Sequence, residues 1–151
     1  MGLGIPLHMH SLSHCATTAC DAAADVAFAF LADPSQLGSW ALGCWDAEPA
    51  GEGTVRGTSL FDSAASYART DADATRLSID FAVGADPAEL VHRISARVIP
   101  GSALGYGENR SLVTLLSWRP AEMPDERWSR VIASHEAEIL LLRARIEEAA
   151  A

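Results

Sequence analysis

The chain has 151 residues, of which 49% are hydrophobic and 21% are charged, with a formal net charge of -9 at pH 7. A chain of this length forms one domain with a substantial core. The acidic balance argues against nucleic acid and against an anionic membrane surface as partners, because both select basic faces. No stretch approaches the roughly 20 apolar residues that a membrane span requires, so we expect no membrane insertion.

Three cysteines, Cys15, Cys20 and Cys44, show no repeated spacing. An odd number of scattered cysteines is typical of reduced thiols, and the start of the chain lacks a secretion signal, so we expect a cytoplasmic protein. Residues 1–10 carry no clear pattern. We therefore predict a loose lead-in over 1–10 and a single domain over 11–151, with the oligomeric state left open and a homodimer among the alternatives.

The first third of the chain predicts a strand and two short helices. Residues 11–20 alternate small, polar and β-branched side chains and favour a strand. Asp21 is a good N-cap for a helix over 22–32, which should end before Pro34 because the residue before proline avoids the helical region. Pro34 can itself begin a second short helix over 35–40.

From residue 41 to about 120 the helical period disappears, and short β-rich runs alternate with turns rich in Gly, Pro and Asp. The runs predict strands over 54–62, 66–69, 76–83, 91–99 and 112–118. In one of them, Leu77, Ile79, Phe81 and Val83 alternate with polar or small residues. This pattern predicts an antiparallel sheet with one apolar and one wet face, and the short spacing suggests a meander.

The longest predicted element is a helix over 125–150, which contains neither Gly nor Pro. At about 1.5 Å per residue it would be roughly 39 Å long. One stripe of this helix holds Trp128, Val131, Ile132, His135, Ile139, Leu142 and Ile146. The apolar face of the sheet must be covered, and only this helix is long enough. A curved sheet around one helix leaves a cavity between them, which is a typical small-ligand site.

The order of these elements, the segment Leu-Ala-Asp-Pro-Ser-Gln-Leu-Gly-Ser-Trp over 31–40 and the final amphipathic helix resemble the START-related (SRPBCC) superfamily. The closest resemblance is to its bacterial polyketide cyclase/dehydrase and lipid-transport branch, and it spans about 11–146. It implies an α+β helix-grip fold, with a curved antiparallel sheet wrapped around the C-terminal helix and an internal apolar cavity. It does not imply one chemistry, because members include enzymes, carriers and sensors.

His135 is the sharpest candidate for chemistry, since its face of the helix would line the cavity. An imidazole there could act as general acid or base on an enolisable substrate. Burial would lower its pKa, while Glu138, three residues further on, could restore the pKa and orient the ring. The alternative is a core histidine hydrogen-bonded to the sheet.

Aromatic residues form a second group of candidates, because a flat apolar ring with a polar tip suits a ligand pocket. The group comprises Trp40, Trp45, Phe61, Tyr67, Phe81, Trp118 and Trp128. We select Trp45, Tyr67, Phe61, Trp118 and Trp128 as ligand-binding candidates, with Trp45 and Tyr67 preferred. The alternative for each is a place in the core.

Strand arginines form a third group. By alternation Asp80, Arg93 and Arg97 oppose the apolar set and should lie on the wet face. One of them could bind a carboxylate or phosphate only if a bulge turned it inward. Arg119, next to Trp118 at a strand end, is the candidate for the cavity mouth.

A metal site has little support. His8, His10 and His14 would share one side of an extended chain beside Cys15, but no second cluster completes a site. We expect no metal. Positioning a reactive chain in a dry cavity needs no cofactor either.

Three functional hypotheses remain from the sequence. The first is binding of a small hydrophobic molecule, polyketide-like or aromatic, with cofactor-independent cyclisation, dehydration or isomerisation in which His135 is the acid or base and Glu138 orients it. The alternative is a non-catalytic carrier or sensor of a lipid or another hydrophobic ligand. The third is an interaction module with a collapsed core, which would lack a cavity of the ~300 Å³ typical of ligand pockets.

Overall fold

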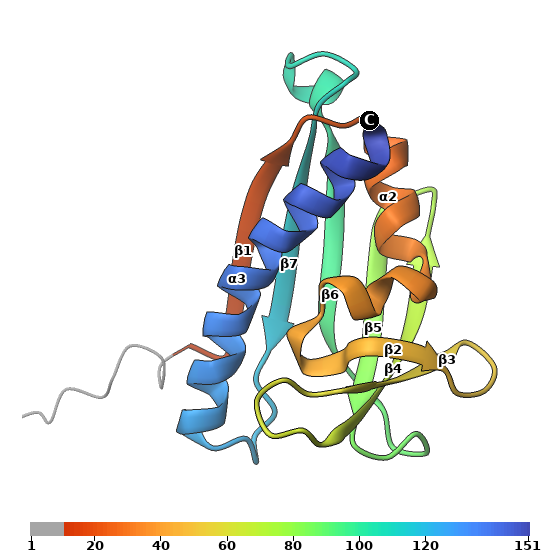
Figure 1. Cartoon of the computed structure of the whole chain (residues 1–151). Helices are drawn as coiled ribbons and strands as arrows, with labels where there is room; N and C mark the ends of the chain where they lie inside the picture. The colour runs from red at the N-terminus through yellow and green to blue at the C-terminus, as the bar shows by residue number, and fades with distance from the viewer. Residues whose placement is uncertain (1–10) are drawn as a thin grey trace, which may run out of the picture.

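Seven strands form one antiparallel sheet in the order β1-β7-β6-β5-β4-β3-β2 (Figure 1). The structure is a computed structural model that describes residues 11–151, so the predicted lead-in over 1–10 lies outside the described residues. The strands are β1 (Ser13–Cys20), β2 (Trp45–Pro49), β3 (Thr54–Thr58), β4 (Ala65–Asp73), β5 (Ser78–Gly84), β6 (Val91–Pro100) and β7 (Ser111–Trp118). From β2 to β7 the strands pair in chain order, which confirms the predicted meander, and β1 closes the sheet beside β7.

The helices lie on one face of this sheet. Helix α3 (Asp125–Ala150) runs diagonally across β1 and β7, and its C-terminal end meets α2 (Ala24–Ala32), as Figure 1 shows. The predicted bounds of α3 are confirmed. Within residues 11–151 there are also three short 3-10 helices, η1 (Pro34–Ser39), η2 (Leu42–Cys44) and η3 (Gly101–Leu104). No helix within the described part of the chain is long and apolar enough to cross a membrane.

The core forms where the two layers meet. Ile79 and Phe81 from β5 and Leu115 from β7 are buried, as are Leu142 and Ile146 from α3. The predicted alternation is therefore confirmed in the centre of β5. Leu77 is excluded from it, because it lies in the turn before β5 with φ at +53°.

Two local predictions were wrong. Asp21 does not cap a helix, because α2 begins at Ala24 with Ala23 at its N-cap and no side-chain capping bond. The carboxylate of Asp21 instead accepts from Arg110 Nη2 at 3.1 Å. Strand β2 was not predicted; it has five residues, its second residue Asp46 has φ at +51°, and its register against β3 shifts between Trp45 and Glu48.

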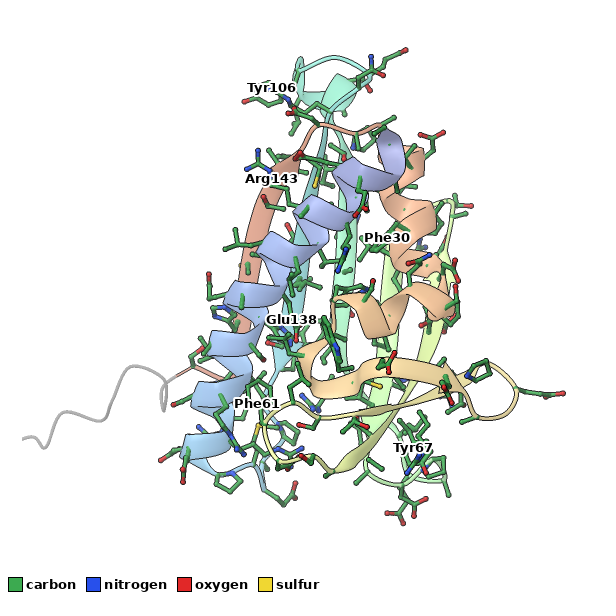
Figure 2. All side chains as sticks on the ribbon, viewed as in Figure 1. Phe30, Phe61, Tyr67, Tyr106, Glu138 and Arg143 are labelled. Atoms are coloured by element: carbon green, nitrogen blue, oxygen red, sulfur yellow. The ribbon has the colours of Figure 1, made fainter. Side chains whose placement is uncertain are left out.

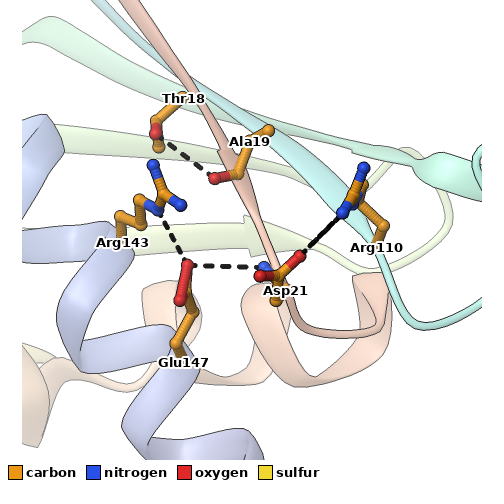
Figure 3. A network of polar contacts seen from close by, with 6 residues as sticks. All are labelled: Thr18, Ala19, Asp21, Arg110, Arg143 and Glu147. Carbon is orange, nitrogen blue, oxygen red and sulfur yellow. Dashed lines mark hydrogen bonds and ion pairs between the residues drawn. The ribbon is translucent and has the colours of Figure 1, made fainter.

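A polar network fixes the C-terminal end of α3 (Figure 3). Glu147 Oε1 accepts hydrogen bonds from Arg143 Nε at 2.8 Å and from the backbone nitrogen of Asp21 at 3.4 Å. The Asp21 carboxylate in turn accepts a hydrogen bond from Arg110. The network thus joins the end of β1, the end of α3 and the residue before β7. Its side chains are exposed, except that of Glu147, which is partly buried, so the network adds little free energy and mainly fixes the relative positions of these segments.

Gly38 allows η1 to lie against β2, because a Cβ at this position would overlap the backbone nitrogen of Ala47. We expect Gly38→Ala to lower the free energy of unfolding by about 2 kcal/mol, the usual cost of overpacking a site that backbone atoms confine. Gly43→Ala is the matched control, because a Cβ there meets nothing within 4 Å. Urea unfolding of both variants checks this, and equal stabilities would contradict it.

Candidate functional site

A cavity of about 470 Å³ lies between the N-terminal half of α3, the η1–η2 segment, the β3–β4 loop and the inner face of β4 to β6. This volume is within the usual range for small-ligand pockets. Its apolar wall includes Leu37, Trp40, Phe61, Phe81, Val83 and Ile94. Figure 2 shows Glu138 midway along α3 and Phe61 in the loop below it, with Tyr67 apart from both at the lower edge.

The polar wall comes chiefly from one stripe of α3. Arg127, Arg130, Ser134, His135 and Glu138 all line the cavity. Arg127, Arg130, Ser134 and Glu138 follow one another at spacings of three and four residues, which places them on one helix face, and His135 lies beside Ser134, three residues before Glu138. Of these five residues, the sequence predicts only His135 and Glu138 as site residues. Extending the helical spacing from these two residues back to the helix start would have found the other three.

Glu138 and His135 are buried together, with side chains 7% and 4% exposed. Glu138 Oε1 accepts from the backbone nitrogen of Leu42 in η2 at 3.0 Å, and Oε2 lies 3.9 Å from His135 Nε2. The second distance is too long for a hydrogen bond. His135 Nδ1 is buried and has no hydrogen-bond partner among the described residues.

Burial sets the protonation states of this pair. It raises the pKa of Glu138 to about 8, although the Leu42 amide and the positive charge of Arg93 act in the opposite direction. Burial, together with the smaller effects of the Arg93 and His14 charges, lowers the pKa of His135 to about 4. Near neutral pH the cavity thus holds a protonated carboxylic acid beside a neutral imidazole. This differs from the expectation that Glu138 would restore the pKa of His135, because Glu138 is itself buried and uncharged.

Arg93 reaches the cavity through a β-bulge. Phe81 pairs with Ile94 and Ala82 with His92, so Arg93 is the extra residue on β6. A bulge re-aims a side chain, and Arg93 lines the cavity next to Ile94. The expectation that Arg93 lies on the wet face was therefore wrong, whereas the exposure of Asp80 and Arg97 was predicted correctly.

The guanidinium of Arg93 is cationic and incompletely satisfied. Burial, and then repulsion from Arg127, lower its pKa to about 10, which still leaves it charged near neutral pH. Its Nη1 is buried and has no hydrogen-bond partner among residues 11–151.

The structure places only one of the five selected aromatic residues on the cavity wall. Phe61 lines the mouth with 48% of its surface exposed. Tyr67 points away because its neighbours Ser66 and Ala68 face the cavity and successive strand residues alternate. Trp118 is 44% exposed at the end of β7, beyond the buried Ser117.

Three other selected residues also lie off the wall. Trp128 is fully buried in the core, and Trp45 is partly buried at the start of β2. Arg119 Nη2 donates to the carbonyl oxygen of Met123 at 2.8 Å and to Asp125 Oδ1 at 2.6 Å. Arg119 thus ties the loop before α3 and is absent from the cavity wall.

Trp40 and Phe81 are the aromatic residues that line the interior of the cavity. Their ring centroids are 5.7 Å apart and their planes meet at 69°, an edge-to-face contact. Both residues belong to the wider aromatic group of the sequence analysis. No feature of the sequence distinguishes them from the aromatic residues that face away from the cavity. Their positions follow from the packing of η1 and β5.

The histidines near the start of the chain give no metal site within the described residues. His8 and His10 lie outside those residues, and His14 Nε2 lies 2.8 Å from Glu136 Oε1. Among residues 11–151, no group of three His, Cys, Asp or Glu side chains is placed to hold a metal ion. The expectation of no metal stays a prediction.

Comparisons with known proteins find similarity in structure but not in sequence. No family model and no curated protein sequence matches this chain. Zhui aromatase/cyclase from Streptomyces sp. R1128 superposes with a TM-score of 0.65 and 18% identity, over 90% of this chain and 93% of that one. The Aha1 dimer from Colwellia psychrerythraea gives 0.64 and 15%, over 93% and 100%. A START superfamily protein from Mycobacterium smegmatis gives 0.57 and 14%, over 90% and 97%.

These similarities show the fold. The chain has the α+β helix-grip fold of START-related proteins, with a curved antiparallel sheet and a long C-terminal helix. The resemblance to the START-related superfamily and its polyketide cyclases is thus confirmed at the level of the fold. At identities of 14–18% the comparisons assign no role to any residue of the cavity.

The opposite pKa shifts of Glu138 and His135 predict an unusual dependence of stability on pH. Between pH 4.5 and 8 the folded state holds the Glu138 proton that the unfolded chain has released, so stability falls as the pH rises. Between pH 4 and 6.5 the unfolded chain holds the His135 proton that the folded state lacks, so stability rises. Between pH 4.5 and 6.5 the two effects on the free energy of unfolding cancel. Above pH 6.5 only the decrease due to Glu138 remains.

We therefore expect the wild-type protein to lose about 2 kcal/mol between pH 6.5 and 8 relative to Glu138→Gln, from roughly 1.5 pH units at about 1.36 kcal/mol per pH unit. The amide keeps an oxygen for the Leu42 nitrogen and has no proton to release. Urea unfolding across this range measures the difference. Glu148→Gln, an exposed position on the same helix, should follow the wild-type curve. Parallel curves for wild type and Glu138→Gln would contradict the shift.

The unpartnered guanidinium of Arg93 should destabilise the ligand-free protein. We expect Arg93→Met to raise the free energy of unfolding by about 1 kcal/mol, because methionine retains the apolar stem and removes a buried, incompletely hydrogen-bonded cation. For a chain of this size the melting temperature should rise by about 3 °C. Arg97→Met, on the same strand but exposed, should give no such gain. A lower melting temperature for Arg93→Met would show that the guanidinium is satisfied in solution.

Proposed function

We propose that the protein binds a small hydrophobic metabolite, polyketide-like or aromatic, in this cavity and catalyses its cyclisation, dehydration or isomerisation by acid–base chemistry. The observation that carries the proposal is the pair formed by Glu138 and His135. A protonated carboxyl and a neutral imidazole, 3.9 Å apart on the wall of a largely apolar cavity, can act on two neighbouring atoms of one substrate.

Dehydration of a β-hydroxy ketone illustrates the proposed chemistry. The Glu138 carboxyl donates a hydrogen bond to the ketone oxygen, which stabilises the negative charge that develops there. His135 removes the proton from the carbon between the ketone and the hydroxyl-bearing carbon, and an enolate forms. When the ketone re-forms, the carbon–hydroxyl bond breaks, and His135 returns the proton to the departing hydroxide, which leaves as water. Both residues end in their starting protonation states.

A carrier or sensor without catalysis is the second candidate. The pKa of His135, about 4, favours it, because a base this weak removes carbon-bound protons slowly near neutral pH. The same cavity would serve both functions. A collapsed-core interaction module is disfavoured, because a cavity of about 470 Å³ is present.

The test uses 3-hydroxy-1-tetralone, a bicyclic β-hydroxy ketone whose dehydration gives fluorescent naphthol. We expect the wild-type protein to accelerate naphthol formation and His135→Ala and Glu138→Gln each to lower the rate by about 100-fold, the usual contribution of a general acid or base. Glu136→Gln, an exposed neighbour, should retain the wild-type rate. Quenching of tryptophan fluorescence measures binding in parallel.

The outcomes separate the two candidates. Binding without acceleration in the wild type would support the carrier and overturn catalysis of this dehydration. Acceleration that survives in both His135→Ala and Glu138→Gln would overturn the assigned residues. Native mass spectrometry of the purified protein supplies an independent check, because a metabolite that remains bound in the cavity identifies the natural apolar ligand.

A further inference from the structure

Three arginines line the cavity of a chain whose net charge is -9. Arg93, Arg127 and Arg130 form no ion pair with a carboxylate among residues 11–151, where other arginines such as Arg110 and Arg143 do. The three arginines place an excess of positive charge on the cavity wall of an otherwise acidic protein. This placement needs a physical explanation.

Of the three arginines, Arg93 is the most shielded from water. The bulge in β6 turns it toward the cavity beside Ile94, and its Nη1 is shielded from water without a hydrogen-bond acceptor. The negative charge of an ionised Glu138 would offset the positive charge of Arg93, but burial keeps the Glu138 carboxyl protonated near neutral pH. A guanidinium that is shielded from water and has an unused N–H donor fits a site in which the ligand supplies the hydrogen-bond acceptor.

Arg127 and Arg130 form the outer part of this arrangement. They lie in the first two turns of α3, where the helix dipole disfavours cations, and as an i,i+3 pair they repel one another. Asp62 in the β3–β4 loop also lines the cavity, and its pKa is lowered chiefly by the hydrogen bond from the Ala64 backbone nitrogen and to a smaller extent by both arginines. It forms no ion pair with either arginine. One carboxylate faces two exposed guanidinium groups, so the mouth carries net positive charge.

We propose that the ligand of this cavity is an amphipathic acid, an apolar body with one carboxylate, and that Arg93 binds the carboxylate. The inference rests on the proposed function in one respect, that the cavity binds a hydrophobic molecule. Trp40, Phe81 and Ile94 receive the apolar body, and Arg127 and Arg130 attract the anion to the mouth. A single shielded guanidinium balances one negative charge, and its planar fork matches the two oxygens of a carboxylate.

Matched acid and amide pairs test the carboxylate directly. Isothermal titration calorimetry at pH 6.5 would compare 2-naphthoic acid with 2-naphthamide and octanoic acid with octanamide, pairs that differ in charge and hardly in size. We expect the wild-type protein to bind at least one acid about tenfold tighter than its amide, as a charge-assisted hydrogen bond supplies. In Arg93→Gln the acid should weaken to the level of the amide, while the affinity for the amide stays within about twofold.

Two further variants isolate the role of Arg93. Arg97→Gln removes the same charge from an exposed position on the same strand and should keep the preference for the acid. Arg93→Lys keeps the charge without the planar fork and should retain only part of the preference. The melting temperature of each variant shows whether it is folded.

The double variant Arg127→Gln/Arg130→Gln should slow association of the acid and reduce the dependence of its association rate on salt.

Each outcome has a distinct meaning. Equal affinity of the wild type for acid and amide, or a preference that survives in Arg93→Gln, would overturn the carboxylate site and leave ligand binding intact. Failure of the wild type to bind either member of both pairs would overturn the proposed hydrophobic-ligand function together with this inference. A preference lost in Arg97→Gln as strongly as in Arg93→Gln would show a general effect of charge and would also overturn the site.

Discussion

The structure depends on how one helix covers one face of a seven-stranded sheet. In the C-terminal half of α3, Ile139, Leu142 and Ile146 are buried against the sheet and α2, and the two layers are in close contact. In the N-terminal half Trp128 is also buried, but the face turned to the cavity carries, besides Val131, the polar or charged side chains of Arg127, Arg130, Ser134, His135 and Glu138. Such side chains do not form a dry apolar interface, because each buried polar group needs a partner. The layers therefore separate there, and the cavity occupies the gap.

Desolvation then determines the chemistry of the gap. The same burial raises the pKa of Glu138, lowers that of His135 and lowers that of Arg93, because it penalises the charged form of every group. Arg93 alone starts from a pKa high enough to remain charged near neutral pH. One uncompensated cation in a largely apolar pocket is a costly arrangement in the absence of ligand. Its cost is the physical argument for a ligand that carries the opposite charge.

The sequence predicts the parts of this structure that local periodicity controls. The bounds of α3, the alternation at Ile79 and Phe81 and the meander of β3 to β7 all follow from patterns within single segments. His135 and Glu138 were found for the same reason, because their place on the helix fixes the side they face. Strand β2 was missed because it is only five residues long, ends at Pro49 and has one large apolar side chain, Trp45.

The remainder depends on pairings between distant segments. Arg93 obeys strict alternation in the sequence, and only its register against β5 reveals that it is the extra residue of a bulge. Trp40 and Phe81 form the aromatic wall because the Trp40 ring, just after η1, packs edge-to-face on Phe81 of β5, while Tyr67 and Trp118 turn away because successive strand residues alternate in direction. A single sequence carries no signal for such registers, since each is fixed by the strand on the other side of the pair.

The proposed acid–base pair and the proposed carboxylate site are linked through Glu138. In the ligand-free cavity, the positive charge of Arg93 lowers the pKa of Glu138 and so opposes the effect of burial. A carboxylate bound to Arg93 would cancel that charge and remove its influence on Glu138. The carboxyl would then hold its proton more firmly, in the form that the proposed chemistry requires. The anionic end of the ligand would in this way prepare the acid that acts on its apolar body.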